Sequence, residues 1–137
     1  MMTGTPTIPA SLSGGPKKML IGGEWVDALS GQTFPTLNPS TGVVLAQIAM
    51  ADEADVDRAV AAARAAFEGP WSRFKPAERQ RILLRLADLV ERDGDELAML
   101  DTLEMGRPIT DSVRVAGIVA RGLRHFAGMA TAIHGET

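Results

Sequence analysis

The 137-residue chain contains no cysteine. Disulfide bonds, thiolate zinc sites and a cysteine nucleophile are therefore excluded within it. It has only two histidines, His125 and His134. Two imidazoles cannot build a metal site unless carboxylates are placed beside them.

The chain also lacks an excess of positive charge and a long hydrophobic run. Its net charge is −3 and its pI is about 5.3, so it offers no basic field for nucleic acid or for an anionic membrane. No stretch approaches the roughly 18 apolar residues of a membrane span. The first residues carry their charges after a small-residue segment and have no apolar core, unlike a secretory signal. We therefore expect a cytoplasmic protein that binds neither nucleic acid nor membrane.

Residues 1–16 are rich in Thr, Ser, Pro and Gly and have few large apolar side chains. Such a segment cannot offset its ordering entropy by burial, so we predict a disordered leader ahead of an ordered part, residues 17–137. Two antiparallel β-hairpins are expected next. Gly22 and Gly23 suit the positive φ of a primed turn in the first hairpin. The predicted strands span residues 19–21, 24–26, 33–37 and 43–48.

Four helices follow in the predicted structure, and each has start or stop signals. Asp52 is the expected N-cap of the first helix. Pro76 suits the first turn of the second helix, and Gly94 can end it. Gly106 ends the third helix. The predicted helices span residues 52–68, 76–94, 95–106 and 110–133.

Each of the longer helices carries an apolar stripe that something must cover. The second helix has five large aliphatics on one face, and the first and fourth helices can supply only part of the cover. Gly117, Gly122 and Gly128 in the fourth helix suggest that another group approaches it closely. The stripes comprise Val56, Val60, Ala63 and Phe67; then Ile82, Leu83, Leu86, Leu89 and Val90; then Val115, Val119, Gly122, Phe126, Met129 and Ile133.

No set of side chains in the sequence forms a catalytic constellation. Neither glycine pair, Gly14-Gly15 or Gly22-Gly23, leads into a helix within a phosphate-binding motif. The carboxylates at 52, 55 and 57 match helix capping better than metal binding. Glu104 has no nucleophile beside it, and His125 has no orienting carboxylate. We therefore predict no catalytic, cofactor-binding or metal-binding residue in this chain.

A series of short stretches along the chain, from residue 19 to the end, carries a family resemblance. They are residues 21–26 (IGGEWV), 34–42 (FPTLNPSTG) and 55–67 (DVDRAVAAARAAF), then Trp71, Arg79, 86–91 (LADLVE), 103–108 (LEMGRP), 124–128 (RHFAG) and Gly135. In this order the stretches resemble the N-terminal part of the NAD(P)-dependent aldehyde dehydrogenase superfamily.

The resemblance implies a protein three to four times longer, with an α/β fold. The remainder would supply the NAD or NADP site, the catalytic cysteine, the glutamate base and the oligomerisation hairpin. Some members also bind a structural cation through a main-chain carbonyl near the position of Leu37. On its own the chain is expected to be an α+β fragment of two hairpins and four helices.

Two functions remain open from the sequence. In the first, the chain is an N-terminal segment that is inactive and binds no cofactor alone. Its partners would be the rest of the enzyme, which acts on a small aldehyde, or further copies in a homo-oligomer. In the alternative, it is a non-enzymatic helical module that binds another chain. Its contact faces would be Leu97, Leu100 and Leu103, and Val115, Phe126 and Ile133.

Overall fold

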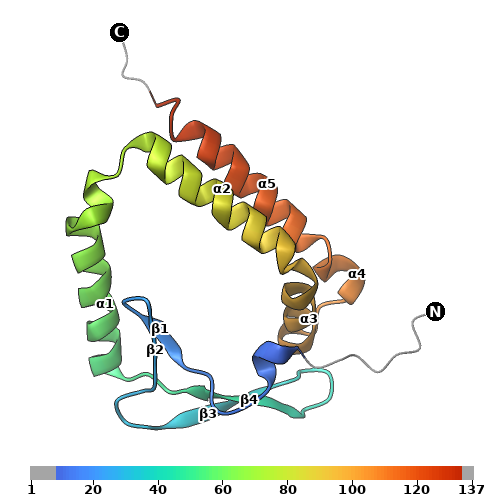
Figure 1. The fold of residues 1–137 in the computed structure, drawn as a ribbon. Helices are drawn as coiled ribbons and strands as arrows, with labels where there is room; N and C mark the ends of the chain where they lie inside the picture. Colours follow the sequence, from blue (N-terminus) through green and yellow to red (C-terminus); the bar gives the residue numbers. More distant parts are fainter. Residues whose placement is uncertain (1–8, 134–137) are drawn as a thin grey trace. The chain divides into compact units, whose positions relative to one another are not determined.

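The computed structural model describes residues 9–133, so His134 lies outside the described residues. These residues form two compact units. The first comprises residues 9–68 together with 103–106, and the second comprises 69–102 together with 107–133. Figure 1 shows the elements in chain order.

The first unit contains the two predicted hairpins. Strands β1 (Met19–Ile21) and β2 (Glu24–Val26) pair antiparallel around Gly22 and Gly23, whose φ angles are 62° and 87°. Both glycines therefore adopt the positive φ that a primed turn requires. Strands β3 (Thr33–Leu37) and β4 (Val44–Ala49) form the second antiparallel pair. The hairpins confirm the prediction, with β4 displaced by one residue.

The described part of the predicted leader contains a short 3-10 helix, η1 (Ala10–Leu12). Residues 1–8 of that leader lie outside the described residues. Just beyond the leader, Lys17 adds a bridge to β4: its N–H donates to the carbonyl of Gln47 at 2.7 Å, and its carbonyl accepts from the N–H of Ala49 at 2.9 Å. The chain is therefore tied to the second hairpin from Lys17 onward.

Helix α1 (Glu53–Glu68) completes the first unit, apart from the short segment 103–106. Asp52 caps it as predicted, because the N–H of Asp55 donates to Asp52 Oδ1 at 3.2 Å. Its alanine-rich face lies against the turn of the first hairpin: a Cβ at Gly22 would be 3.8 Å from the Cβ of Ala62. Small residues at this contact allow a helix and a hairpin turn to approach closely.

The second unit begins with a 3-10 turn, η2 (Pro70–Arg73), and helix α2 (Pro76–Arg92). The N–H of Lys75 donates to Glu78 Oε2 at 2.7 Å, which satisfies a backbone donor at the helix start. The guanidinium of Arg79 lies over the ring of Trp71, 5.0 Å from its centroid. The η2 turn is thereby attached to the first turns of α2.

Helix α3 (Gly94–Met105) follows after a one-residue break at Asp93. The predicted end of α2 at Gly94 is wrong, because Gly94 is the first residue of α3 and lacks the positive φ of a helix-ending glycine. The predicted fourth helix, 110–133, is wrong as a single element. It is divided into one turn, α4 (Ile109–Ser112), and the longer α5 (Val115–Met129). The physical reason lies at Ser112, whose side chain is buried and donates to Asp101 Oδ2 at 2.8 Å. This contact with α3 fixes the end of α4 and redirects the chain before α5 begins.

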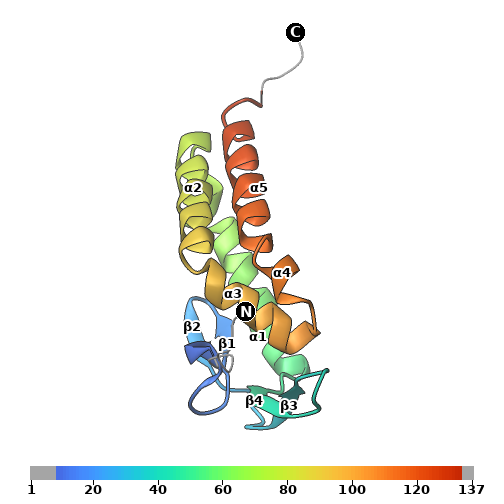
Figure 2. The ribbon, with the colours of Figure 1, turned by 90° about the vertical axis from the view of Figure 1, so that its right-hand side faces the viewer.

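Helices α2 and α5 lie side by side and antiparallel, as Figures 1 and 2 both show. Their contact is built on small side chains: Ala87 on α2 and Ala120 and Ala127 on α5 have no exposed surface. Alanine at these positions permits a short distance between helix axes. The two hairpins and four longer helices confirm the predicted α+β class, with α4 as an additional single turn.

Candidate docking surfaces

The apolar stripe of α2 is divided between two environments. Leu83 and Val90, which flank Ala87, are half-buried on the side that faces α5. Ile82 and Leu86 belong to the same predicted stripe, yet they remain 43% and 44% exposed. Helix α5 therefore covers only part of the stripe, as the sequence suggested.

The uncovered part is a shallow apolar depression of about 400 Å³ along one side of α2. We call it the outer face of α2. Its apolar side chains are those of Ile82, Leu86 and Leu89, and Arg81 and Arg85 border it. Among the described residues, no hydrogen bond or ion pair involves the side chain of Arg81 or Arg85.

Where α2 meets α5, in contrast, the charged side chains are paired. Arg124 donates to both carboxylate oxygens of Glu91, each at 2.7 Å, and to Asp88 Oδ1 at 2.9 Å. These hydrogen bonds from Arg124 lower the pKa of Glu91 below its ordinary value, against a smaller effect of desolvation. The acidic charges of α2 on this side are thus neutralised within the unit.

The predicted stripe of the last helix is also largely open. Val119, Phe126 and Met129 on α5 are 44%, 65% and 48% exposed. The close approach expected at its glycines is not found among the described residues, since a Cβ at Gly122 or Gly128 would meet nothing within 4 Å. It occurs instead at the start of α3, where a Cβ at Gly94 would lie 3.1 Å from the Cβ of Ala116 on α5.

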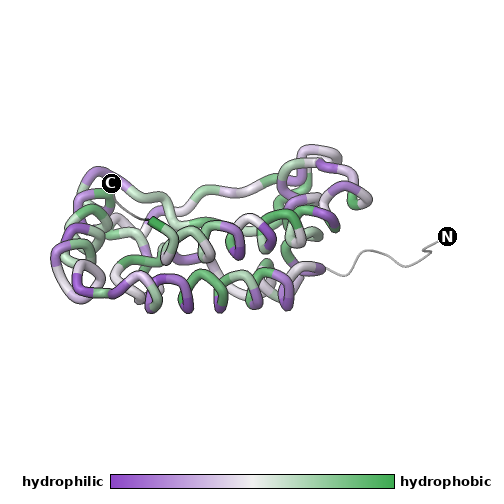
Figure 3. The backbone as a smooth tube through the Cα atoms, turned by 90° about the horizontal axis from the view of Figure 1, so that it is seen from above, coloured by the Kyte–Doolittle hydropathy of each residue, from purple (hydrophilic) through white to green (hydrophobic). Residues whose placement is uncertain are grey.

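In the first unit, α1 is exposed along nearly its whole length. Val56, Val60 and Phe67 are all more than half exposed. An apolar depression of about 310 Å³ is lined by Val60, Ala63, Arg64 and Phe67. Figure 3 shows hydrophobic and hydrophilic residues recurring within each turn of the helices. This periodicity gives a helix one apolar face.

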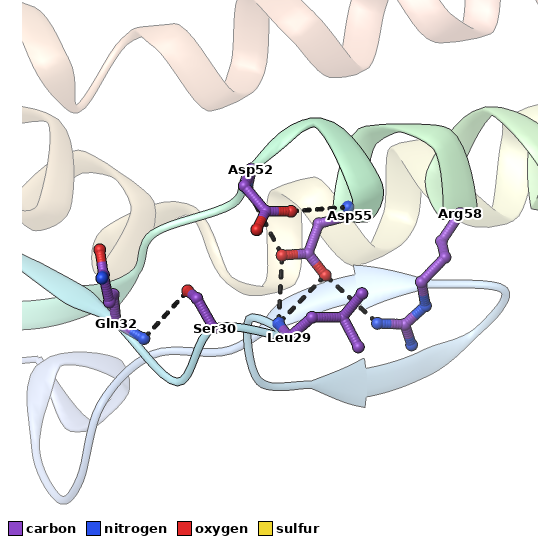
Figure 4. A network of polar contacts seen from close by, with 6 residues as sticks. All are labelled: Leu29, Ser30, Gln32, Asp52, Asp55 and Arg58. Carbon is purple, nitrogen blue, oxygen red and sulfur yellow. Dashed lines mark hydrogen bonds and ion pairs between the residues drawn. The ribbon is translucent and has the colours of Figure 1, made fainter.

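The sequence interpretation underestimated the structural role of Asp55. The residue is 1% exposed, whereas capping and dipole compensation predict a surface acid. Figure 4 shows its carboxylate accepting hydrogen bonds from the N–H of Leu29 at 3.2 and 3.3 Å, from the N–H of Asp52 at 3.4 Å and from Arg58 Nη1 at 3.2 Å. It joins α1 to the segment between β2 and β3. In the sequence, only the place of Asp55 in the capping pattern pointed to this role. The contact with Leu29 could not be predicted from residue type, because Leu29 contributes a backbone N–H.

A second buried polar cluster lies between α3 and α4. Ser112 is 1% exposed; its hydroxyl donates to Asp101 Oδ2 and lies 3.2 Å from the hydroxyl of Thr102. Arg107 Nη1 is 3.6 Å from the same Asp101 oxygen. Asp101 and Ser112 also line a mainly apolar cavity of about 240 Å³ whose other walls include Val90, Leu97 and Val119. Each carboxylate and hydroxyl here has a partner within the unit.

The remaining predicted candidates do not assemble into a reactive site. Glu104 accepts a hydrogen bond from the Thr36 hydroxyl at 3.3 Å, next to the position of Leu37. His125 contacts the ring of Phe126 edge-on, with centroids 5.4 Å apart. Within residues 9–133, no group of three or more His, Asp or Glu side chains could hold a metal ion.

The leucines proposed for an interaction module are unequally exposed. Leu97 is 43% exposed, whereas Leu100 and Leu103 are half-buried. Ile133 is 81% exposed. None of the helices in the described part of the chain is long and apolar enough to cross a membrane. The prominent features of the described residues are therefore open apolar faces rather than a reaction centre.

Comparison with known proteins places these faces in context. The model of the aldehyde dehydrogenase family matches residues 25–137. The mitochondrial aldehyde dehydrogenase of Equus caballus is 51% identical over 123 residues, which cover 88% of this chain and 25% of that protein. The mitochondrial benzaldehyde dehydrogenase of Antirrhinum majus is 50% identical over 88% of this chain and 23% of its own length.

Solved structures agree with the sequence comparison. The NAD+ complex of an aldehyde dehydrogenase from Bacillus cereus matches with a TM-score of 0.89 and 42% identity, over 97% of this chain and 27% of that chain. The chain thus spans about a quarter of the length of the relatives it matches. It belongs to the aldehyde dehydrogenase family and corresponds to an N-terminal part of it.

Proposed function

We propose that this chain is the N-terminal scaffold of an NAD(P)-dependent aldehyde dehydrogenase. One observation carries the proposal: α1, α2 and α5 each present an apolar face that the helix's own unit leaves exposed. Such faces are costly in water and normally mark a contact with other protein. Because the relatives are about four times longer, the rest of such an enzyme is the natural cover.

The whole enzyme would oxidise an aldehyde to a carboxylate. Aldehyde, water and NAD(P)+ give carboxylate, NAD(P)H and two protons. The cofactor accepts the hydride when it is bound. This chain has no cysteine, so a thiolate nucleophile would come from the rest of the enzyme. The NAD+ complex of the Bacillus cereus relative supports this cofactor class.

The chain alone is proposed to bind no cofactor and to have no dehydrogenase activity. Its physiological contacts would be the rest of the enzyme, with further copies joining through that larger part. We retain the prediction of a cytoplasmic location, which cell fractionation tests. A helical interaction module is the weaker hypothesis, because no observation favours it over the family's own architecture.

The experiment compares the isolated chain with a graft. In the graft, this chain replaces the matching 123-residue stretch of the horse enzyme. We expect the graft to form NADH from NAD+ and an aldehyde, and the isolated chain to form none. The isolated chain should also bind an apolar fluorescent dye through its open faces. Activity of the isolated chain, or a folded graft that is inactive, contradicts the proposal.

A further inference from the structure

We propose that the outer face of α2 docks an apolar segment of the enzyme's remaining three quarters, and that this segment carries carboxylates to pair with Arg81 and Arg85. The inference rests on the proposed scaffold function and adds where the contact lies and what chemistry meets it. Neither arginine has a partner among the described residues, although the acids of α2 that face α5 do.

The shape of the face fits a protein segment. Ile82, Leu86 and Leu89 recur at four- and three-residue spacing, so they form a continuous strip over about two turns. The strip is shallow and almost entirely apolar, and it has a volume of about 400 Å³. A helix or strand that lays an apolar edge along it would bury side chains now 43% and 44% exposed.

The positive charges of Arg81 and Arg85 at the border determine which kind of segment can bind the outer face. Arg81 and Arg85 are four residues apart, so their side chains project from the same side of the helix. A segment that covers the strip also removes water from these guanidinium groups, and a buried unpaired charge is costly. Carboxylates on the segment would offset that cost, because guanidinium and carboxylate form strong, directional hydrogen bonds.

The same charge argues against a second copy of this face. In a two-fold contact the identical surface would lie on both sides, so a second Arg81 and a second Arg85 would border the same interface. Like charges collected at one interface oppose association. The local acids cannot relieve this, since Arg124 already occupies Asp88 and Glu91. The occupant is therefore acidic and different from this surface.

The test uses the graft with Arg81→Lys and Arg85→Lys. A carbodiimide couples a lysine amine to a carboxylate only when the two are in ion-pair contact, and peptide mass spectrometry identifies the linked residues. We expect links from position 81 or 85 to Asp or Glu in the part from the horse enzyme. The matched control, Arg73→Lys with Arg114→Lys, changes two exposed arginines outside the outer face and should give no such link.

Charge reversal provides a second measurement. Arg81→Glu with Arg85→Glu should lower the melting temperature of the graft by more than Arg73→Glu with Arg114→Glu does. The inference is overturned if an active graft gives no links from position 81 or 85. It is also overturned if the only links lead to acids of this chain, in the same molecule or in a second copy. Equal melting temperatures of the two reversals also overturn it. A folded but inactive graft instead overturns the scaffold function, and the inference with it.

Discussion

Arg124 on α5 holds Glu91 on α2 through two parallel hydrogen bonds, each 2.7 Å long. A third bond from the same guanidinium, to Asp88, makes one arginine the polar link between the two helices. Planar, two-point contacts of this kind give orientation as well as attraction. The alanine contacts between α2 and α5 set the distance between the two helices. Arg124 fixes the position of one helix along the axis of the other.

We expect Arg124→Met to lower the melting temperature of the chain, because it keeps the stem of the side chain but leaves Asp88 and Glu91 unpaired. Arg124→Lys should recover part of the difference, since an ammonium cannot form the two-point contact. Circular dichroism melts at low and high salt provide the measurement. The groups are partly exposed, so the effect should shrink at high salt. An effect that salt does not change would contradict an electrostatic link.

Stability should fall as the pH drops below the ordinary pKa of glutamate. Arg124 lowers the pKa of Glu91 in the folded chain from its ordinary value of 4.5. Between these two pKa values the unfolded chain binds more protons than the folded one, so acid favours unfolding. The contribution is fully present above about pH 4.5 and decreases as pH falls through the lowered value. In urea titrations at several pH values, Glu91→Gln should show a weaker acid dependence than the unmodified chain; an identical dependence would contradict this assignment.

The packing between α2 and α5 should not tolerate a larger side chain. Ala120 has no exposed surface, so Ala120→Leu is expected to cost about 1–3 kcal/mol of unfolding free energy through overpacking. Ala77→Leu, at an exposed position in the first turn of α2, is the matched control and should change stability by at most about 0.5 kcal/mol. Chemical denaturation measures both. Equal effects would show that the alanine contact does not determine how closely the helices pack.

Loss of the Asp55 carboxylate should destabilise the first unit. Asp55→Ala would leave the N–H groups of Leu29 and Asp52 without their acceptor, at a cost of about 1–3 kcal/mol. The matched control is Asp57→Ala on the exposed side of the same helix. Amide hydrogen exchange at Leu29 gives a local readout, and it should accelerate in Asp55→Ala but not in Asp57→Ala. Unchanged protection at Leu29 would contradict the role of this carboxylate.

The sequence predicted those elements whose signals are local. Gly22-Gly23 requires a particular turn, Asp52 marks a helix start and Gly106 marks a helix end, so the hairpins and the first three helices were predicted, except for the boundary at Gly94. Apolar periodicity also indicated that α2 needs a cover. It could not show which half of the stripe α5 would cover, because that depends on alanines that contribute little to the hydrophobic pattern.

The features that were missed depend on long-range contacts. Ser112 divides the predicted last helix because its hydroxyl donates a hydrogen bond to Asp101 on another helix. Asp55 is buried because the backbone of Leu29, 26 residues earlier, donates to it. Arg124 finds its partners 33 and 36 residues away. Periodicity and capping rules describe one element at a time, so they contain no information about these pairs.

We propose that this chain is a scaffold that becomes part of an active enzyme only with the rest of the family fold. NADH formation by the graft into the horse enzyme tests this role, with the isolated chain assayed in parallel. We predict aldehyde-dependent NADH formation by the graft and none by the isolated chain. A folded graft that does not oxidise aldehydes, or an isolated chain that does, would contradict the account.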